Sequence, residues 1–265
     1  ASDGEHDSLL LRSVRRRSAL SNVCLSLHND FPMGAGLGGS SAATAAMLTA
    51  VAEWKGEPWD RCAVAEAGRQ IEVEDLGIAG GRQDHYAATF GGALALTFTT
   101  RVTVHRIPLS ARTCDDFISR SLLVYTGQSR VSGETVTAVL GSYEKGERRV
   151  VQSLRRMREL AEQMATALER ADLDAVAGLM DEHWQFQRTL HPAIPTPLID
   201  DIIDRARSAG ALGGKAMGAS GGGCVLVMAR PDTADRVRQA IASLGTILEF
   251  QVDSQGVAVT ASDGA

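Results

Sequence analysis

The chain has 265 residues, of which 44% are hydrophobic and 22% are charged. This composition is typical of a globular protein and excludes the intrinsically disordered and fibrous classes. Lys and Arg number 27 against 32 Asp and Glu, so the net charge is −5. That balance argues against nucleic acid as a partner, because surfaces that bind nucleic acid are basic. Any anionic ligand must therefore be bound by local features of the chain.

The apolar segments are too short to cross a membrane. The longest apolar run covers residues 224–229, far below the roughly 20 residues of a membrane-spanning helix. The first residues are polar and acidic and lack the pattern of a signal peptide, so we expect a cytoplasmic protein without a membrane partner. The cysteines Cys24, Cys62, Cys114 and Cys224 form no Cys-x-x-Cys pair and are expected to be reduced thiols in the core.

Hydrophobic periodicity predicts helices and strands that alternate irregularly, which favours an α+β fold over a doubly wound sheet. The predicted strands cover residues 23–28, 93–98, 102–107, 121–126, 224–228 and 247–252. The predicted helices cover residues 40–54, 59–72, 150–170, 173–190, 198–206 and 233–244. Glycines at 77, 80 and 81 predict an irregular loop after the second helix, because glycine adopts backbone angles that other residues avoid.

A glycine-rich segment between the first predicted strand and helix has the most informative pattern. This first glycine loop reads Pro32-Met33-Gly34-Ala35-Gly36-Leu37-Gly38-Gly39-Ser40-Ser41-Ala42. Glycines let backbone N–H groups converge, and the helix start adds unpaired donors and the positive end of its dipole. Such a loop binds phosphate without a net positive charge. The two serine hydroxyls can cap the helix or bind a metal carried by that phosphate.

Three other interpretations fit the first glycine loop less well. The P-loop signature requires a Lys after the last glycine, and none follows here. Gly34, Gly36 and Gly39 satisfy the dinucleotide-binding pattern, but no strand with a terminal acidic residue follows about 20 positions later. A simple helix-entry turn would not need so many glycines, since each of them costs chain entropy.

The first glycine loop resembles the second motif of the GHMP small-molecule kinases, Pro-x-x-x-Gly-Leu-Gly-Ser-Ser-Ala, with Gly39 as one extra glycine. Residues 213–224, the second glycine loop, read Gly-Gly-Lys-Ala-Met-Gly-Ala-Ser-Gly-Gly-Gly-Cys. They are similar to that family's carboxy-terminal motif, which packs against the ATP loop. The resemblance implies ATP binding by Pro32, Gly34, Gly36, Leu37, Gly38, Gly39, Ser40, Ser41, Ala42, Gly218, Gly221 and Gly222.

Residues 71–92 resemble the branch of this family that contains the heptose 7-phosphate kinases, in which a Gly-Gly-Lys-Gln-Asp-Gln-Tyr segment carries the catalytic aspartate. The resemblance makes Asp84 the catalytic base. A carboxylate beside the acceptor hydroxyl can accept its proton, and a loop-capping role is the alternative. The implied acceptor-binding residues are Gly81, Arg82, Gln83, His85 and Tyr86. Arg82 and His85 stand where that branch has Lys and Gln. The departure at His85 lies next to Asp84 and therefore concerns acceptor selectivity.

The same resemblance implies Mg²⁺ binding by Ser41 and Glu72, because this metal prefers oxygen ligands. Glu74 is the alternate ligand, since the spacing does not decide between the two glutamates, and either could be a solvated charge at a helix end. Arg130 is the candidate for binding a sugar phosphate through its planar guanidinium, with Arg188 as a weaker second. A surface charge is the alternative for each arginine.

The resemblance implies a two-domain α+β GHMP kinase. Residues 1–108 would form an ATP-binding domain like ribosomal protein S5 domain 2, and residues 109–265 a ferredoxin-like domain, with the boundary near Pro108. The family's amino-terminal sugar-binding motif, Arg-x-Pro-Leu-Arg followed by Gly-Gly-Gly-Thr-Asp, does not occur in the sequence. We therefore expect the first strands of the first domain, and part of the acceptor pocket, to be missing from these residues.

The implied reaction transfers the γ-phosphate of Mg·ATP to the anomeric hydroxyl of D-glycero-D-manno-heptose 7-phosphate. An anomeric kinase for another sugar, such as fucose, is the nearest alternative. A non-catalytic homologue would bind ATP without turnover. An NAD-type protein would be stabilised by nicotinamide nucleotides and not by ATP.

Overall fold

The computed structural model describes residues 9–30, 34–128 and 133–260. The chain forms two compact units. Unit 1 consists of the described parts of 1–31, 38–91 and 254–265, and unit 2 of those of 32–37 and 92–253. Pro108 lies within unit 2 by this division, and the family-domain boundary expected near it stays a prediction.

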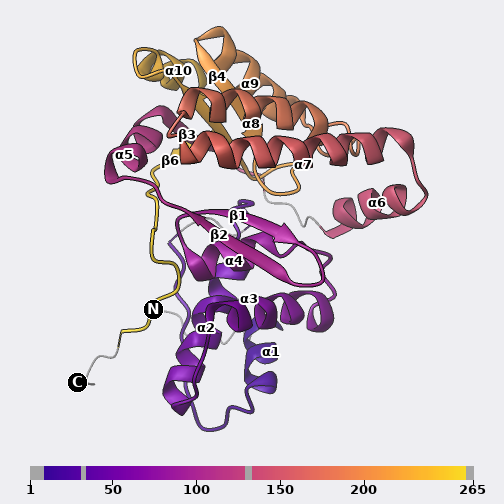
Figure 1. Cartoon of the computed structure of the whole chain (residues 1–265), viewed down its shortest axis with the longest axis vertical. Coiled ribbons are helices and arrows are strands. Elements are labelled where there is room, and N and C mark those ends of the chain that lie inside the picture. The colour runs from indigo at the N-terminus through magenta and orange to yellow at the C-terminus, as the bar shows by residue number, and fades with distance from the viewer. Residues whose placement is uncertain (1–8, 31–33, 129–132, 261–265) are drawn as a thin grey trace. The chain divides into compact units, whose positions relative to one another are not determined.

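Unit 1 is built from helices that pack around the alanine-rich α2. Figure 1 shows α2, α3 and α4 lying against one another. Val14 of α1, Met47 of α2 and Ile71 of η1 are buried in one apolar cluster of this unit. The helical elements are α1 (Leu9–Arg17), α2 (Gly39–Lys55), α3 (Arg61–Gln70), the π-helical segment η1 (Ile71–Asp75) and α4 (Gln83–Phe90).

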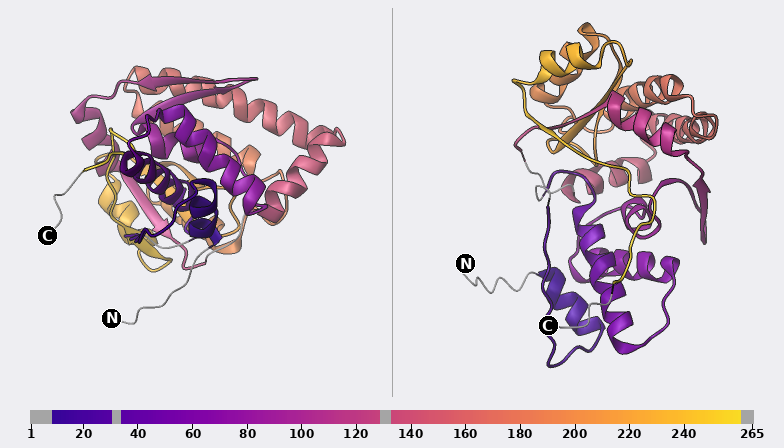
Figure 2. Two further views of the ribbon diagram at one scale, coloured as in Figure 1. Left: turned by 90° about the horizontal axis from the view of Figure 1, so that it is seen from below. Right: turned by 90° about the vertical axis from the view of Figure 1, so that its left-hand side faces the viewer.

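Unit 2 contains a two-stranded hairpin and a four-stranded sheet. In the hairpin, β1 (Ala93–Phe98) pairs in antiparallel register with β2 (Val102–Ile107). Both strands have the predicted bounds. The helices of this unit are α5 (Ala111–Arg120), α6 (Gly133–Glu144), α7 (Arg148–Glu169), α8 (Leu173–Gln187), α9 (Pro197–Ser208) and α10 (Ala234–Ile241). The long pair α7 and α8 lies side by side, as Figures 1 and 2 show.

The four-stranded sheet has the order β4-β5-β3-β6, and every neighbouring pair is antiparallel. Its strands are β3 (Ser121–Tyr125), β4 (Ala211–Ala216), β5 (Cys224–Ala229) and β6 (Thr246–Leu248). Helices occupy the β3-to-β4 and β5-to-β6 connections. This order and connectivity are those of the expected ferredoxin-like domain.

Side chains of β5 alternate between two apolar clusters, as the period of a strand requires. Val225 and Val227 pack with residues of α9 and α10, whereas Leu226 and Met228 pack with residues of α7 and α8. Trp184 is completely buried in the first of these clusters. Because both faces of β5 are covered, the strand could be predicted from its continuous apolar sequence.

Two predictions of secondary structure were wrong. Residues 23–28 form no strand, because an extended segment needs a hydrogen-bonded neighbour to form a ladder and none is described beside them. Residues 213–216, expected to belong to the second glycine loop, lie in the strand β4 (Ala211–Ala216). The glycines of β4 hid the strand, since glycine is depleted in strands. The last predicted strand, 247–252, is shorter, and α1, α5 and α6 were not predicted.

The four cysteines are free thiols, as expected. The expectation that all of them lie in the core was wrong, because Cys24 and Cys62 are exposed and only Cys224 is fully buried. Within the part of the chain that the structure describes, no helix combines the length and the apolar character needed to cross a bilayer.

Gly213 of β4 packs directly against the backbone of α8, and this contact can be tested by its effect on stability. A Cβ atom at this position would clash with the carbonyl oxygen of Ala177 in α8, a backbone atom that cannot move without displacing the helix. We predict that Gly213→Ala lowers the free energy of unfolding by at least about 2 kcal/mol, in the range known for overpacked cores. Urea-unfolding curves measure the change.

The matched control is Gly141→Ala. Gly141 lies inside α6, and a Cβ atom there would meet nothing within 4 Å. Alanine is favoured over glycine in a helix by up to about 1 kcal/mol, so this variant should be as stable as the wild type or more stable. Equal stability of the Gly213→Ala and wild-type proteins would contradict the packing described here.

Candidate functional site

The first glycine loop leads into α2 through residues with left-handed backbone angles. Gly34, Gly36 and Gly38 have φ of 72°, 75° and 71°, a region that favours glycine. Gly38 is the N-cap of α2 and provides no side-chain cap. The N–H groups of residues 39–41 have no partner within the helix, whereas the N–H of Ala42 already donates to the carbonyl oxygen of Gly38 at 2.9 Å. The first three can bind an anion. Pro32 lies outside the described residues.

In unit 2, the beginning of the first glycine loop packs against the second. The N–H of Cys224 donates to the carbonyl oxygen of Ala35 at 2.9 Å. A Cβ atom on Gly36 would lie 3.3 Å from the carbonyl oxygen of Met217, and one on Gly223 would lie 2.6 Å from that of Ala35. Glycine is required at Gly223, because the backbones approach too closely for a side chain. The same region buries Leu37 partly against Ala35 and Met217.

The second glycine loop is held by further hydrogen bonds within unit 2. Its Gly218 carbonyl accepts from the amide Nε2 of Gln187 at 2.9 Å. The N–H of Gly221 donates to the carbonyl of Ile194 at 2.9 Å, so this amide is already used within the protein. Gly222, with φ of 157°, approaches the carbonyl oxygen of Gln128. These contacts give Gly221 and Gly222 structural roles, whether or not they also contact a nucleotide.

In unit 1, two predicted site residues lie beside one imidazole nitrogen of a third. The Nε2 atom of His85 lies 2.8 Å from Oε2 of Glu72 and 3.5 Å from Oγ of Ser41. His85 and Ser41 are buried, and the Glu72 side chain is only 16% exposed. A Cβ atom on Gly80 would lie 3.2 Å from Oε2 of Glu72. The structure therefore brings together residues from α2, η1, α4 and the loop between them.

The two glutamates that the sequence offered as metal ligands, Glu72 and Glu74, have different surroundings in the structure. Glu74 forms an ion pair with Arg17 at 2.9 Å, and its side chain is 59% exposed. Glu72, in contrast, faces His85 beside Ser41. The π-helical geometry of η1 places the two side chains in different surroundings. Of the two, Glu72 is the one positioned with the other predicted metal ligand.

Asp84 lies in the first turn of α4 and faces the start of α2. A Cβ atom on Gly38 would lie 3.3 Å from Cβ of Asp84 and 3.9 Å from its Oδ1. Asp84 is exposed by surface area, but the protein atoms packed around its carboxyl displace part of its water and raise its pKa above the ordinary value. Positive charge on His85 lowers that pKa, and the negative charge of Glu72 raises it. The candidate base therefore lies beside the helix start that can bind an anion.

Two of the predicted acceptor-binding residues interact with Glu66 of α3. The hydroxyl of the buried Tyr86 donates to Oε1 of Glu66 at 2.8 Å, and Nη1 of Arg82 lies 3.7 Å from the same atom. Burial and this carboxylate raise the pKa of Tyr86. Gly81 and Gln83 are exposed at the start of α4. Sequence reasoning missed Glu66, because no spacing rule relates α3 to the turn before α4.

Of the two arginines predicted to bind a sugar phosphate, the structure describes only Arg188. Nη2 of Arg188 donates to both carboxylate oxygens of Asp200 at 2.8 Å. Its positive charge is therefore paired with a carboxylate within unit 2. Arg130 lies outside the described residues.

The side chains near His85 suit a magnesium ion carried by a nucleotide better than a metal held by the protein alone. Among the described residues, no three His, Cys, Asp or Glu side chains form a cage for a metal ion. Ser41 and Glu72 offer oxygen atoms beside one another, and Mg²⁺ commonly binds one or two protein oxygens together with waters and substrate phosphates. These residues therefore fit that metal.

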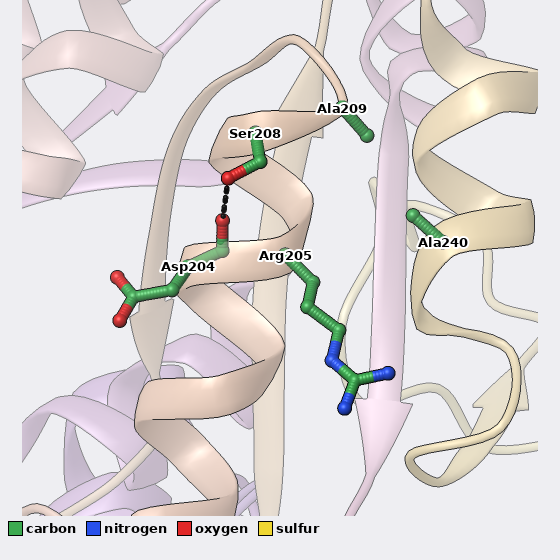
Figure 3. A pocket seen from close by; sticks show the side chains of 5 residues that line it. All are labelled: Asp204, Arg205, Ser208, Ala209 and Ala240. Carbon is green, nitrogen blue, oxygen red and sulfur yellow. Dashed lines mark hydrogen bonds between the residues drawn. The ribbon is translucent and has the colours of Figure 1, made fainter.

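A surface depression lies between α9 and α10 in unit 2 (Figure 3), and none of the predicted site residues lines it. Its acidic and basic side chains already have partners, since Arg205 pairs with Asp201 and Asp204 pairs with Arg207. The hydroxyl of Ser208 donates to the carbonyl of Asp204 at 2.8 Å. The residues that line the depression are Asp204, Arg205, Ser208, Ala209 and Ala240. It contains none of the groups that phosphoryl transfer needs.

Comparison with known proteins identifies the family. Residues 8–92 match the family model described as GHMP kinases N terminal domain, and residues 164–246 match GHMP kinases C terminal. D-glycero-alpha-D-manno-heptose 7-phosphate kinase of Campylobacter jejuni is 30% identical over 240 residues, which cover 89% of this chain and 70% of that protein. The chain belongs to the GHMP kinase family.

One solved structure and one further relative bear on the fold and on the share of each relative that this chain covers. The crystal structure of a D-glycero-D-manno-heptose 1-phosphate kinase from Bacteriodes thetaiotaomicron has a TM-score of 0.73 at 24% identity, covering 98% of this chain and 78% of that one. This similarity confirms the GHMP kinase fold. The bifunctional fucokinase/GDP-fucose pyrophosphorylase of Arabidopsis thaliana is 25% identical over 92% of this chain, which spans only 23% of that protein.

The raised pKa of Asp84 predicts how its replacement affects stability. Because the folded-state pKa is raised, ionisation is less favourable in the folded protein than in the unfolded chain, so the carboxylate lowers stability at neutral pH. We predict that Asp84→Asn is at least as stable as the wild type at neutral pH. The difference should vanish below a pH of about 3.9, the ordinary pKa of aspartate, where the carboxyl is neutral in both states.

Urea-unfolding midpoints of both proteins at neutral and acid pH measure this effect. A clear loss of stability in Asp84→Asn at neutral pH would contradict it. That result would support the alternative in which the carboxylate caps a loop, since a cap stabilises its ionised form.

Proposed function

We propose that this GHMP-family sugar kinase transfers the γ-phosphate of ATP to the anomeric hydroxyl of D-glycero-D-manno-heptose 7-phosphate. The 30% identical relative carries this sugar phosphate in its name, and the family supports ATP as the phosphate donor. The observation that carries the proposal is the position of Asp84 beside Gly38, the N-cap of α2. A proton acceptor and a phosphate-binding helix start therefore lie together in unit 1.

In the proposed reaction, Asp84 accepts the proton of the anomeric hydroxyl as its oxygen attacks the γ-phosphorus. The bond from that phosphorus to the bridging oxygen of ATP breaks, and ADP leaves with the electron pair. The N–H groups at the start of α2 stabilise the negative charge on the phosphates. Bound Mg²⁺ would neutralise phosphate oxygens, and Ser41 and Glu72 would hold it. The protein contributes mainly positioning and charge stabilisation, as phosphoryl transfer requires.

The raised pKa of Asp84 suits its role as base. A carboxylate that is more basic than usual accepts a proton from the acceptor hydroxyl more readily. The raised pKa also predicts that activity falls with acidification at a higher pH than for an ordinary aspartate.

A free sugar such as fucose is the alternative acceptor. The Arg188–Asp200 ion pair favours it, because a paired arginine is less available to bind the phosphate of a phosphorylated sugar. The similarity to the Arabidopsis protein, whose name includes fucokinase, points the same way. The identity of the acceptor is therefore the part of the proposal that needs the most direct test.

We predict that the full-length protein forms ADP from Mg·ATP only when heptose 7-phosphate is present, and that Asp84→Asn lowers kcat at least about 100-fold, the contribution typical of a general base. A coupled ADP assay with heptose 7-phosphate, free heptose, fucose and no acceptor measures this. The substitution should leave the affinity for ATP unchanged, since Asp84 acts on the acceptor.

Each pattern of turnover has a different meaning. Turnover of fucose or free heptose in preference to the phosphorylated sugar would show that the protein is a sugar kinase with a different acceptor from the one proposed. ATP binding without turnover of any acceptor would contradict the proposal and support a non-catalytic homologue. Full activity in Asp84→Asn would remove this residue from the mechanism.

A further inference from the structure

His85 is buried between two side chains that the proposed function assigns to metal binding. Its imidazole is 1% exposed. One ring nitrogen, Nε2, lies 2.8 Å from Oε2 of Glu72 and 3.5 Å from Oγ of Ser41. The ring therefore points into the protein and away from solvent. An acceptor sugar could not reach it without disrupting unit 1.

The other ring nitrogen of His85, Nδ1, packs against the backbone of a neighbouring helix without a hydrogen bond to the described part of the chain. Nδ1 is buried and has no hydrogen-bond partner among the described residues. It faces the backbone of α3, where a Cβ atom on Gly68 would lie only 2.9 Å away. A buried polar atom without a partner is costly. The orientation of the ring must therefore come from the contacts of Nε2 and from the shape of the space beside Gly68.

The first turn of α4 directs two consecutive side chains to different neighbours. Asp84 faces Gly38 at the start of α2, and His85 faces Glu72 and Ser41. Displacing His85 would free the two oxygen-bearing side chains without removing the candidate base. Because charge on His85 also lowers the pKa of Asp84, the role of His85 is tested by cation binding and not by turnover.

We propose that His85 is a positioning residue that holds Glu72 and Ser41 as a preformed pair of oxygen ligands for the divalent cation of the nucleotide complex. Its Nε2–H donates to Oε2 of Glu72, which leaves Oε1 for the cation. The backbone of Gly68 keeps the ring from turning away. This inference rests on the proposed function, because only there do Glu72 and Ser41 bind a metal.

Two substitutions of His85 separate the contribution of each ring nitrogen. The amide of glutamine reaches the position of Nε2 and retains an N–H donor, whereas the amide of asparagine ends near Nδ1 and leaves Glu72 without a partner. His85→Gln should therefore preserve the ligand pair and His85→Asn should release it. Asparagine also leaves a larger void than glutamine at this buried position, so urea-unfolding midpoints of both variants serve as the control for packing: the proposal predicts that Mn²⁺ binding differs between them by more than their stability does.

The experiment measures the binding of Mn²⁺, as a paramagnetic probe, to the full-length protein saturated with a non-hydrolysable ATP analogue, by electron paramagnetic resonance. We expect His85→Asn to weaken Mn²⁺ binding at least tenfold and His85→Gln to stay within threefold of wild type. Binding of the analogue without metal, measured calorimetrically in EDTA, should stay within twofold in all variants. Equal Mn²⁺ binding by His85→Asn and wild type, or equal losses in both variants, would overturn the proposal.

Gly68→Ala tests the packing beside Nδ1 of His85. It replaces His85→Asn as the test if that variant fails to fold. Its Cβ atom would lie 2.9 Å from Nδ1 and force the imidazole out of its present position, so it should weaken Mn²⁺ binding at least tenfold. Gly178→Ala, inside α8, is the matched control, because a Cβ atom there would meet nothing within 4 Å. Unchanged Mn²⁺ binding in Gly68→Ala, or an equal loss in the control, would overturn the proposal.

The ADP assay distinguishes failure of this inference from failure of the proposed function. A wild type that turns over heptose 7-phosphate, with His85→Asn binding Mn²⁺ normally, overturns the role of His85 alone. A wild type without turnover, but with Mn²⁺ binding that depends on His85 as described, overturns the sugar kinase and supports the positioning role. Absence of Mn²⁺ binding in the wild type overturns both.

Discussion

Side chains of the candidate site approach the backbone closely at glycines, and this close approach determines how the site is arranged. In unit 1, each of three candidate functional side chains lies where a neighbouring glycine has no Cβ atom. The pairs are Asp84 with Gly38, Glu72 with Gly80, and His85 with Gly68. Protein interiors are packed too densely to absorb an added methyl group without movement. The glycines therefore help to determine where the carboxylates and the imidazole can lie.

The same constraint operates between backbones in unit 2. The two glycine loops meet through the hydrogen bond from Cys224 to Ala35, and Gly223 leaves no room for a side chain at that contact. Glycine in these loops is thus needed for packing, in addition to any contact with phosphate. Much of the similarity to GHMP kinases in these loops can be explained by the geometry that the backbone must adopt.

Local patterns were enough to predict much of the fold, whereas features that depend on distant neighbours could not be predicted. The hairpin of 93–98 and 102–107 has its predicted bounds because alternation marks strands. Residues 23–28 show similar alternation but form no strand, since pairing depends on a second strand. Motif resemblance located Asp84 and Glu72. It gave no indication that His85 turns inward, because that orientation depends on Gly68 in another helix.

The central claim, that the chain transfers phosphate to an anomeric hydroxyl, is tested most directly by phosphorus NMR of the full-length protein with Mg·ATP and heptose 7-phosphate. The account predicts that the γ-phosphate signal of ATP is replaced by a phosphate ester whose phosphorus couples to the anomeric proton, while the 7-phosphate signal persists. Formation of inorganic phosphate alone, an ester at another carbon, or no change in the ATP signals would contradict it.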